Sequence, residues 1–427
     1  MGFFEIFFMV VGVFGFGFWI LAFFTSLGRG PAKFTLTEPV SFASEYFFRV
    51  LEGLSRTTFE YGGLPEILNN GNEFFSAFFK DIFEAKYTIH IATFILRPSD
   101  PIGQALTYTL MKKAREGVKV RLLLDSSGSK NITKKVYQKF KNAGIKVVMF
   151  RPFEFGILTQ YNRRSHCRAF VIDGRVGYTG GMAFGQEWTG DAEDKRHWRD
   201  QMFRVTGAQA RAIQRVFSSL WTNTCGQVLV GEGIYPALDQ APLKESRWIS
   251  LISSPALQTN PLRNAYWLSL MAAKKTIYVQ QSYFFPSRYM RQALMQKAHE
   301  GVEVILILPN EHNDEKIVYY AGRFFYDQLL SAGVKIYEFL PTMIHSKNFL
   351  ADDIWSIIGS ANMDIRSEEL NDENILCILS PEFGQAQRQH FEADLAQSKQ
   401  ILLPYWRKRP WQERCLESLC MLLGRQL

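Results

Sequence analysis

Four side chains suited to binding and transferring a phosphate lie close together in the second half of the chain. His345 and Lys347 stand two apart in an alternating run, so a strand places both on one face. If Asp352 and the next aspartate form a two-residue hairpin turn, Ser360 lies directly opposite His345. Asn362 then follows just beyond the strand end. A histidine, a cation, a hydroxyl and an amide together form a pocket that suits a bound phosphate.

An earlier stretch repeats this pattern at the same spacing. His166 and Arg168 are followed by Asp173 and then by Gly181, which takes the position of Ser360. Asp173 and the glycine after it are a strong signal for a two-residue hairpin turn, and in that register His166 faces Gly181. Because chance repetition of such a pattern within one chain is improbable, the repeat indicates an internal duplication with two half-sites.

These residues resemble the signature of the phospholipase D superfamily, in which His-x-Lys, four residues, Asp, six residues and Gly-Ser-x-Asn occur twice per active unit. From about Tyr61 to the C-terminus the chain is similar to the bacterial cardiolipin synthase branch. The resemblance implies two pseudo-twofold-related α/β/α domains that bring both motifs into one cleft. Beyond the motif histidines, it runs through residues 113–120, 171–182, 198–200, 333–337, 359–364, 366–367 and 371–373.

The resemblance also implies a chemistry for the two histidines. One histidine attacks phosphorus to give a phosphohistidine, and the other protonates the departing alcohol and then activates the incoming one. The usual order in the family makes His166 the nucleophile and His345 the general acid/base. Carboxylates behind the imidazoles would fix their tautomers, and we assign Glu373 to His345 and Asp200 to His166.

Charged and polar side chains of both motifs are expected to bind the substrate phosphate. Arg168, Lys347 and Asn362 would hold its non-bridging oxygens, and Ser360 would donate a hydrogen bond or orient a neighbour. Arg164, which precedes the first motif, is a candidate for binding a second anionic head group. The alternative for Arg164 is a solvated basic surface.

The aspartates of the two motifs, Asp173 and Asp352, belong to the expected site by resemblance. Their positions in the sequence favour a role in a turn or an ion pair over direct participation. No cluster with metal-ligand spacing is present, and the five cysteines are scattered. We therefore expect neither a metal nor another cofactor in the reaction, and no disulfide framework.

The first motif departs from the family pattern at four positions. Ser165 stands where the branch usually has Asn, Cys167 where it has Arg, Arg168 where it has Lys, and Ala183 where Asn is expected. A guanidinium still binds phosphate but is bulkier than an ammonium, and the loss of the Asn amide removes an oxyanion donor. The first half-site is therefore slower, altered in substrate or degenerate.

Composition bounds the class of protein. The chain has 427 residues, 47% of them hydrophobic, and a formal net charge of +8. This length fits two domains of about 180 residues each with extensions, and the charge favours an anionic partner. The expected partners are an anionic phospholipid (phosphatidylglycerol or cardiolipin) and the membrane, with nucleic acid disfavoured. Oligomeric state stays open.

The N-terminal region predicts a membrane anchor. Residues 6–28 carry no charge and are long enough, as a helix, to cross a hydrocarbon core of about 30 Å. A cleaved signal peptide is the alternative, but no basic segment precedes the apolar run. Arg29 and Lys33 follow it, so the catalytic body is expected on the cytoplasmic side of the inner membrane, with a single pass.

The remaining pattern predicts α/β organisation. Helices and strands alternate in the first half, and the second half repeats this order, which indicates largely parallel sheets covered by helices. The basic, aromatic C-terminal tail either lies at the level of the lipid head groups or docks on the protein. The expected domains are 1–30 (anchor), 31–62 (connector), 63–240 and 241–427. The expected elements are helices 41–54, 73–85, 103–116 and 130–143, and strands 88–95, 118–125 and 145–150.

Together these features favour a membrane-bound phosphatidyltransferase resembling cardiolipin synthase. It would join two phosphatidylglycerols into cardiolipin and glycerol through a phosphohistidine. A lipid hydrolase of phospholipase D type is the nearest alternative. A metal-independent phosphodiesterase or nuclease of the same fold and a non-catalytic anionic-lipid binder also remain open.

Overall fold

A computed structural model describes residues 34–152, 162–238, 243–255 and 260–423, together with isolated positions 4, 12 and 15. The described residues from Pro39 onward form one compact unit. Among the residues described, no helix combines the length and apolar character needed to cross a membrane. The predicted anchor, residues 6–28, lies outside them apart from two isolated glycines.

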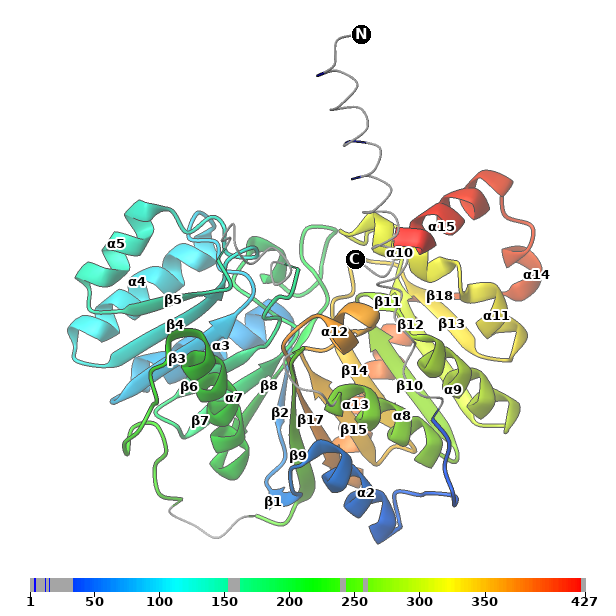
Figure 1. The fold of residues 1–427 in the computed structure, drawn as a ribbon, viewed down its shortest axis with the longest axis horizontal. Helices are drawn as coiled ribbons and strands as arrows, with labels where there is room; N and C mark the ends of the chain where they lie inside the picture. The colour runs from blue at the N-terminus through cyan, green and yellow to red at the C-terminus, as the bar shows by residue number, and fades with distance from the viewer. Residues whose placement is uncertain are drawn as a thin grey trace. The chain divides into compact units, whose positions relative to one another are not determined.

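The first half folds into a sheet with strand order β2-β8-β7-β6-β3-β4-β5 (Figure 1). β3, β4 and β5 are parallel, but the other four pairings of this sheet are antiparallel. The expected largely parallel sheet is therefore wrong, because the β6–β7 hairpin and strands β8 and β2 extend the sheet antiparallel. Helices α3 and α4 pack on one face and α7 on the other. The elements are β2 (Glu66–Asn69), α3 (Asn70–Glu84), β3 (Thr88–Thr93), α4 (Pro101–Arg115), β4 (Lys119–Asp125), α5 (Lys134–Asn142), β5 (Lys146–Phe150), β6 (Ala169–Ile172), β7 (Val176–Gly180), η1 (Gln186–Trp188), β8 (Gln201–Thr206) and α7 (Gly207–Cys225).

The second half repeats this plan in a sheet with the order β1-β9-β17-β15-β14-β10-β12-β13-β18, and a short parallel pair, β11 and β16, lies apart from it. Its elements are β9 (Ser246–Ser253), α8 (Pro261–Ala272), β10 (Thr276–Gln281), β11 (Phe284–Phe285), α9 (Arg288–His299), β12 (Glu303–Pro309), α10 (Lys316–Arg323), α11 (Tyr326–Ser331), β13 (Lys335–Phe339), β14 (Lys347–Ala351), β15 (Trp355–Gly359), β16 (Met363–Asp364), α12 (Ile365–Glu369), β17 (Glu373–Leu379), α13 (Pro381–Ala396), β18 (Ser398–Ile401), α14 (Leu403–Trp406) and α15 (Trp411–Leu423).

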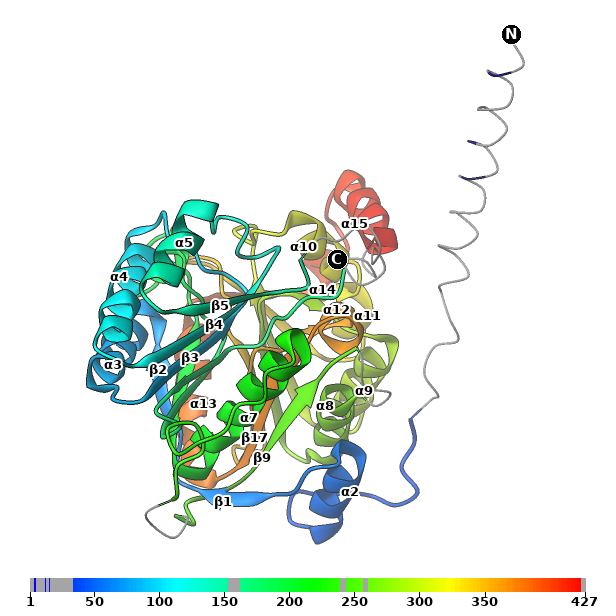
Figure 2. The same cartoon turned by 60° about the vertical axis from the view of Figure 1, so that its left-hand side comes forward.

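The segment expected as a connector contributes to the second half. It contains α2 (Glu45–Ser55), which the side chain of Ser44 caps, and β1 (Glu60–Gly62). β1 pairs with β9, and α2 contacts α8, so residues that precede the first half in sequence complete the sheet of the second (Figure 2). One hydrophobic core also joins the halves, because Phe203 of β8 and Ile358 of β15 belong to the same buried cluster.

The two motif hairpins have a different register from the one predicted. Ile172 pairs with Val176 and Ala351 with Trp355, so three residues separate the paired positions instead of two. The expected opposition of each motif histidine to the Ser or Gly across the hairpin is therefore wrong.

The cause lies in the turn. Asp173 and Gly174 both have positive φ, as expected for the centre of a tight hairpin turn, and Arg175 N–H donates to the carbonyl of Ile172 (3.0 Å). The ladder begins one residue later, so Arg175 is an additional unpaired residue, as in a β-bulge. Residues 351–354 repeat this geometry in the second half.

The motif aspartates fasten these turns to the neighbouring strand. The Asp173 carboxylate accepts the backbone N–H groups of residues 86–88, each at 2.7 Å, just where β3 begins. The Asp352 carboxylate accepts those of residues 274–276 at the start of β10. The structure therefore places both aspartates in the turns, and neither lines the cavity shared by the two motif histidines.

We predict that Asp352→Ala lowers the free energy of unfolding by about 1–3 kcal/mol, because three backbone donors lose a charged acceptor. Turnover per folded molecule should stay within about threefold of wild type, because no other group of the site changes position. Thermal unfolding and turnover measured on the same preparation check this. A large loss of turnover at unchanged stability would return Asp352 to the catalytic residues.

Candidate active site

The two halves meet backbone to backbone at the motif histidines. The N–H of His166 donates to the carbonyl of Asp372 (2.9 Å), and the N–H of His345 donates to that of Arg199 (2.7 Å). Each histidine is thus fixed beside a segment of the opposite half. The residue that follows in each such segment is an acid, Glu373 in one case and Asp200 in the other.

This crossing decides which carboxylate holds which imidazole. His166 Nδ1 lies 3.1 Å from both carboxylate oxygens of Glu373, and His345 Nδ1 lies 2.7 Å from Asp200 Oδ2. The predicted assignment, Glu373 with His345 and Asp200 with His166, is therefore wrong: the acids are right and the partners are exchanged. Sequence proximity suggested pairs within a half, whereas the bridges between the halves bring each acid to the other histidine.

Burial sets the protonation of these pairs. It lowers the pKa of His166 to about 4 and that of His345 to about 3, against the partly compensating carboxylates. Burial by itself would raise the pKa of Glu373 and Asp200. The adjacent histidines and the hydrogen bonds that the two carboxylates accept outweigh burial, so both pKa values lie below normal. At neutral pH each neutral imidazole therefore donates from Nδ1 to a carboxylate and keeps an Nε2 lone pair.

The cation two residues after each histidine has the same contact in both halves. Arg168 Nη1 donates to the carbonyl of His166, and Lys347 Nζ donates to that of His345, each at 2.6 Å. Arg168 Nη2 lies 3.3 Å from His166 Nε2, and Lys347 Nζ lies 3.2 Å from His345 Nε2. Arginine in the first motif therefore occupies the place of the lysine in the second.

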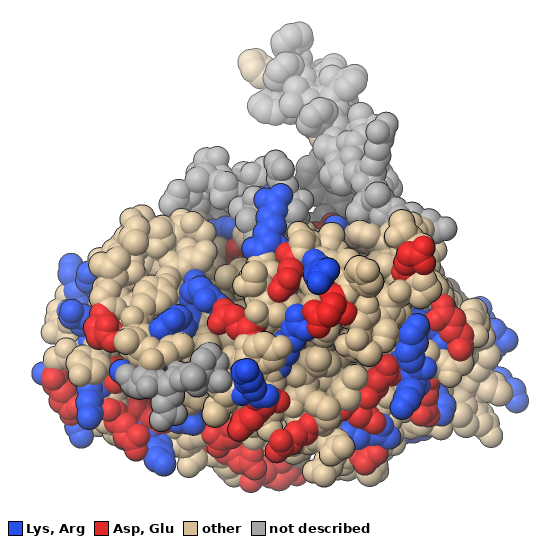
Figure 3. Space-filling model, turned by 90° about the horizontal axis from the view of Figure 1, so that it is seen from below, with Lys and Arg blue, Asp and Glu red and all other residues tan. Residues whose placement is uncertain are grey.

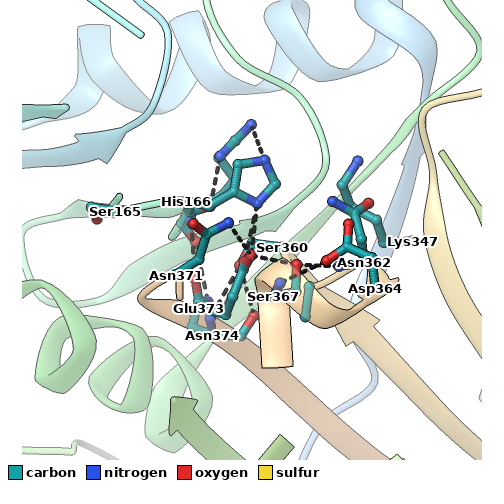
Figure 4. A network of polar contacts seen from close by, with 12 residues as sticks. Ser165, His166, Lys347, Ser360, Asn362, Asp364, Ser367, Asn371, Glu373 and Asn374 are labelled. Atoms are coloured by element: carbon teal, nitrogen blue, oxygen red, sulfur yellow. Dashed lines mark hydrogen bonds and ion pairs between the residues drawn. The ribbon is translucent and has the colours of Figure 1, made fainter. Parts of the chain in front are cut away.

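Hydroxyl and amide donors hold Glu373 in place (Figure 4). Ser360 donates to Oε2, while Ser367 (2.8 Å) and Asn371 (3.3 Å) donate to Oε1. Ser360 thus supports the histidine of the other half, His166, through Glu373. Ser367 and Asn371 were absent from the predicted site, although both lie in the segments that carry the family resemblance.

Asp200 is held differently. It accepts the indole N–H of Trp188 (3.0 Å) and the backbone N–H of Gln201 (2.7 Å). At Gly181, the counterpart of Ser360, an added Cβ would lie 2.2 Å from an Asp200 oxygen, so only glycine leaves room for this carboxylate. Trp188 lies outside the motif and gave no signal in the sequence.

Asn362 completes the second half-site. Ser282 accepts a hydrogen bond from Lys347 (2.8 Å) and donates to Asn362 Oδ1 (2.7 Å), so one hydroxyl orients both the cation and the amide. The corresponding position of the first half holds Ala183, which is fully buried and offers no side-chain donor.

Both histidines open on one cavity of about 390 Å³. Trp198 stacks on the His345 ring at 5.2 Å between centroids. Arg164 is 4% exposed and lies 3.6 Å from Asp125, so the solvated alternative for this residue is wrong. The lining residues are Phe94, Ile95, Arg97, Arg164, His166, Arg168, Glu187, Trp188, Trp198, Tyr283, Asp314, Glu315, Val318, His345, Asn362, Asp364, Arg366 and Asn371.

Comparison with solved structures agrees with the duplicated architecture. The crystal structure of phosphatidylserine synthase from Haemophilus influenzae superposes with a TM-score of 0.70 over 90% of this chain and 100% of that chain, at 15% identity. Polyphosphate kinase from Porphyromonas gingivalis gives 0.53 over 88% of this chain and 53% of that one, at 12% identity. These likenesses show that the chain shares its fold with both proteins.

Sequence comparison narrows this class. A family profile described as cardiolipin synthase, PLD-like domain, matches residues 78–221 and 268–395. The cardiolipin synthase of Halalkalibacterium halodurans is 32% identical over 89% of this chain and 75% of its own length, and that of Geobacillus kaustophilus is 34% identical over 84% and 71%. The chain belongs to the cardiolipin synthase family, which confirms the resemblance.

We predict that Gly181→Ser, which restores the Ser of the second motif, lowers turnover at least about 100-fold, because its Cβ displaces Asp200 and with it His345. Gly53→Ala is the matched control, since open space surrounds an added Cβ there. Turnover and thermal unfolding of both variants check this. Full activity of Gly181→Ser would show that Asp200 does not need its observed position.

The buried ammonium predicts an alkaline limb. Burial lowers the pKa of Lys347 to about 7, so the group loses its charge as pH rises through that value in the empty enzyme. Because the charged form binds phosphate, kcat/KM should fall above about pH 7, and Lys347→Arg should shift this limb upward, since a guanidinium stays protonated. A pH profile of kcat/KM for both proteins tests this, and an identical limb in the variant would assign it to another group.

Proposed function

We propose that the protein is a membrane-bound phosphatidyltransferase that joins two phosphatidylglycerol molecules into cardiolipin and glycerol. The observation that carries this proposal is the pair of neutral, carboxylate-held histidines on one cavity, each with its own buried cation. Membership of the cardiolipin synthase family supports the choice of substrate.

In the first step His166 Nε2 attacks phosphorus of a phosphatidylglycerol. The bond to the glycerol oxygen breaks, and a proton from His345 Nε2 goes to that oxygen, so glycerol leaves and a phosphatidyl-histidine remains. Both imidazoles are neutral in the empty site because of burial. The phosphate charge beside His345 raises the pKa of that imidazole on binding, so its Nε2 takes up a proton from solvent before the first step.

In the second step the hydroxyl of another phosphatidylglycerol gives its proton to His345 Nε2. Its oxygen attacks phosphorus, the bond from His166 to phosphorus breaks, and cardiolipin forms. Arg168, Lys347 and Asn362 hold the non-bridging oxygens in both steps. Before the first step Arg168 turns its N–H from His166 Nε2 to a phosphate oxygen, which frees the nucleophile.

The same proposal covers localisation and partners. The uncharged residues 6–28 would form a single-pass anchor in the inner membrane, with the catalytic body in the cytoplasm. Arg164, buried at the cavity wall, would bind the second anionic head group. The face in Figure 3 mixes acidic and basic side chains and presents no continuous basic track along which a nucleic-acid backbone would lie.

Incubation of the purified full chain with phosphatidylglycerol vesicles and a chelator tests the proposal. We expect equal amounts of cardiolipin and glycerol, and His345→Ala should lower the rate of their formation at least about 1,000-fold. Phosphatidic acid as the main product would replace synthesis by hydrolysis. Degradation of DNA or RNA that His345→Ala abolishes would indicate a nuclease.

The assignment of the nucleophile has its own test. We predict that acid-free quenching and mass spectrometry find a phosphatidyl adduct on His166 and none on His345, because only the attacking nitrogen bonds phosphorus. Asp200→Asn should slow both formation and resolution of this adduct, since His345 is the acid of the first step and the base of the second. An adduct confined to His345 would reverse the two roles.

A further inference from the structure

Helix α15 buries a charged side chain and exposes large apolar ones, the reverse of an ordinary surface helix. Glu417 is 1% exposed, and Cys420 is buried beside it. The outward side is apolar instead: Trp411, Leu416, Leu419, Leu422 and Leu423 are 68%, 41%, 63%, 66% and 51% exposed. A surface helix of a water-soluble protein places these groups the other way round.

Ion pairs hold the helix in this orientation. Arg323 of α10 binds Glu417 (3.2 Å) and Glu413 (2.9 Å), and Arg409 binds Glu417 from the other side. These buried charges fix which side of α15 faces α10. The packing therefore keeps the apolar side outward. Rotating the helix would bury leucines against arginines and leave the arginine charges without their acidic partners.

The outward side has the composition of a membrane-interface helix. Lys408 and Arg414 are exposed next to Trp411, while the two nearby glutamates, Glu413 and Glu417, are engaged with arginines. Trp beside basic residues, with leucines further along, is typical of a helix that lies among anionic lipid head groups with its apolar side toward the acyl chains.

The position of α15 links this surface to the cavity. α15 packs along α10, as Figure 1 shows at the upper right, and Val318 of α10 forms part of the cavity wall. Glu315, at the start of α10, lines the same cavity. A lipid surface on α15 therefore lies one helix away from the space that receives the substrate.

We propose that the apolar side of α15 (Trp411, Leu416, Leu419, Leu422 and Leu423, the α15 stripe) docks the catalytic body on an anionic bilayer. A second copy of the chain is the alternative occupant of this surface. The five side chains have up to about 200 Å² each and are only partly exposed, so their exposed area is below the roughly 800 Å² that each partner buries in a stable interface. The choice of lipid rests on the proposed function, whereas the test below reads position and does not depend on turnover.

Two native cysteines make the test direct. Of the five cysteines, all described, Cys225 and Cys415 are exposed. Cys415 lies on α15, and Cys225 ends α7 in the other half. An environment-sensitive fluorophore is placed on Cys415 in a Cys225→Ser protein, and on Cys225 in a matched Cys415→Ser protein, both as the full chain in vesicles of phosphatidylglycerol and phosphatidylcholine.

Bromine on the acyl chains should quench the Cys415 probe by about half and leave the Cys225 probe nearly unchanged. Equal quenching of both probes, or of neither, overturns the proposal. So does a blue shift of the Cys415 probe that grows with protein concentration in lipid-free detergent, because it would mean a second copy covers the stripe.

Charge substitution gives an independent check. Leu419→Glu combined with Leu422→Glu should lower cardiolipin formation on vesicles about tenfold and leave cleavage of soluble bis(p-nitrophenyl) phosphate unchanged. Tyr108→Glu is the matched control, because Tyr108 is 69% exposed on α4. Equal losses in the two proteins would overturn the role of the stripe. If wild type makes no cardiolipin while the Cys415 probe is quenched, the proposed function fails and the docking surface stands.

Discussion

The structure depends on two hydrogen bonds that cross from one half of the chain to the other. Glu373 of the second half holds His166 of the first, and Asp200 of the first holds His345 of the second. Neither histidine has its acid within its own half. A working pair of imidazoles therefore exists only when both halves are folded and packed, and the hydrophobic core that runs through both holds them together.

Within this symmetric plan, the two half-sites solve the same problem with different side chains. A serine hydroxyl supports Glu373, whereas the indole of Trp188 supports Asp200 and glycine replaces the serine. The amide of Asn362 has only Ala183 as its counterpart. The first motif keeps its histidine and cation, Glu373 of the other half holds that histidine, and the missing amide leaves one fewer donor for a phosphate oxygen.

Burial is the common physical cause behind the chemistry and the surface. Burial of the side chains keeps both imidazoles neutral and lowers the pKa of Lys347, so the charges of these groups change when the phosphate binds. On α15 the same cost of burying charge works in reverse. Glu417 is buried because arginines pair with its charge, and the leucines remain exposed, where they can contact an apolar partner.

Local spacing and residue type were enough to predict the duplication, the α/β class, the family and the candidate side chains of the site. The crossed partners of His166 and His345 came only from the tertiary structure, since they depend on backbone bridges between segments far apart in the chain. The hairpin register could not be predicted from the sequence either, because one extra residue after each turn shifts the strand pairing without changing the alternation of the side chains. The role of Trp188 could not be predicted either, because only folding brings its indole N–H to Asp200.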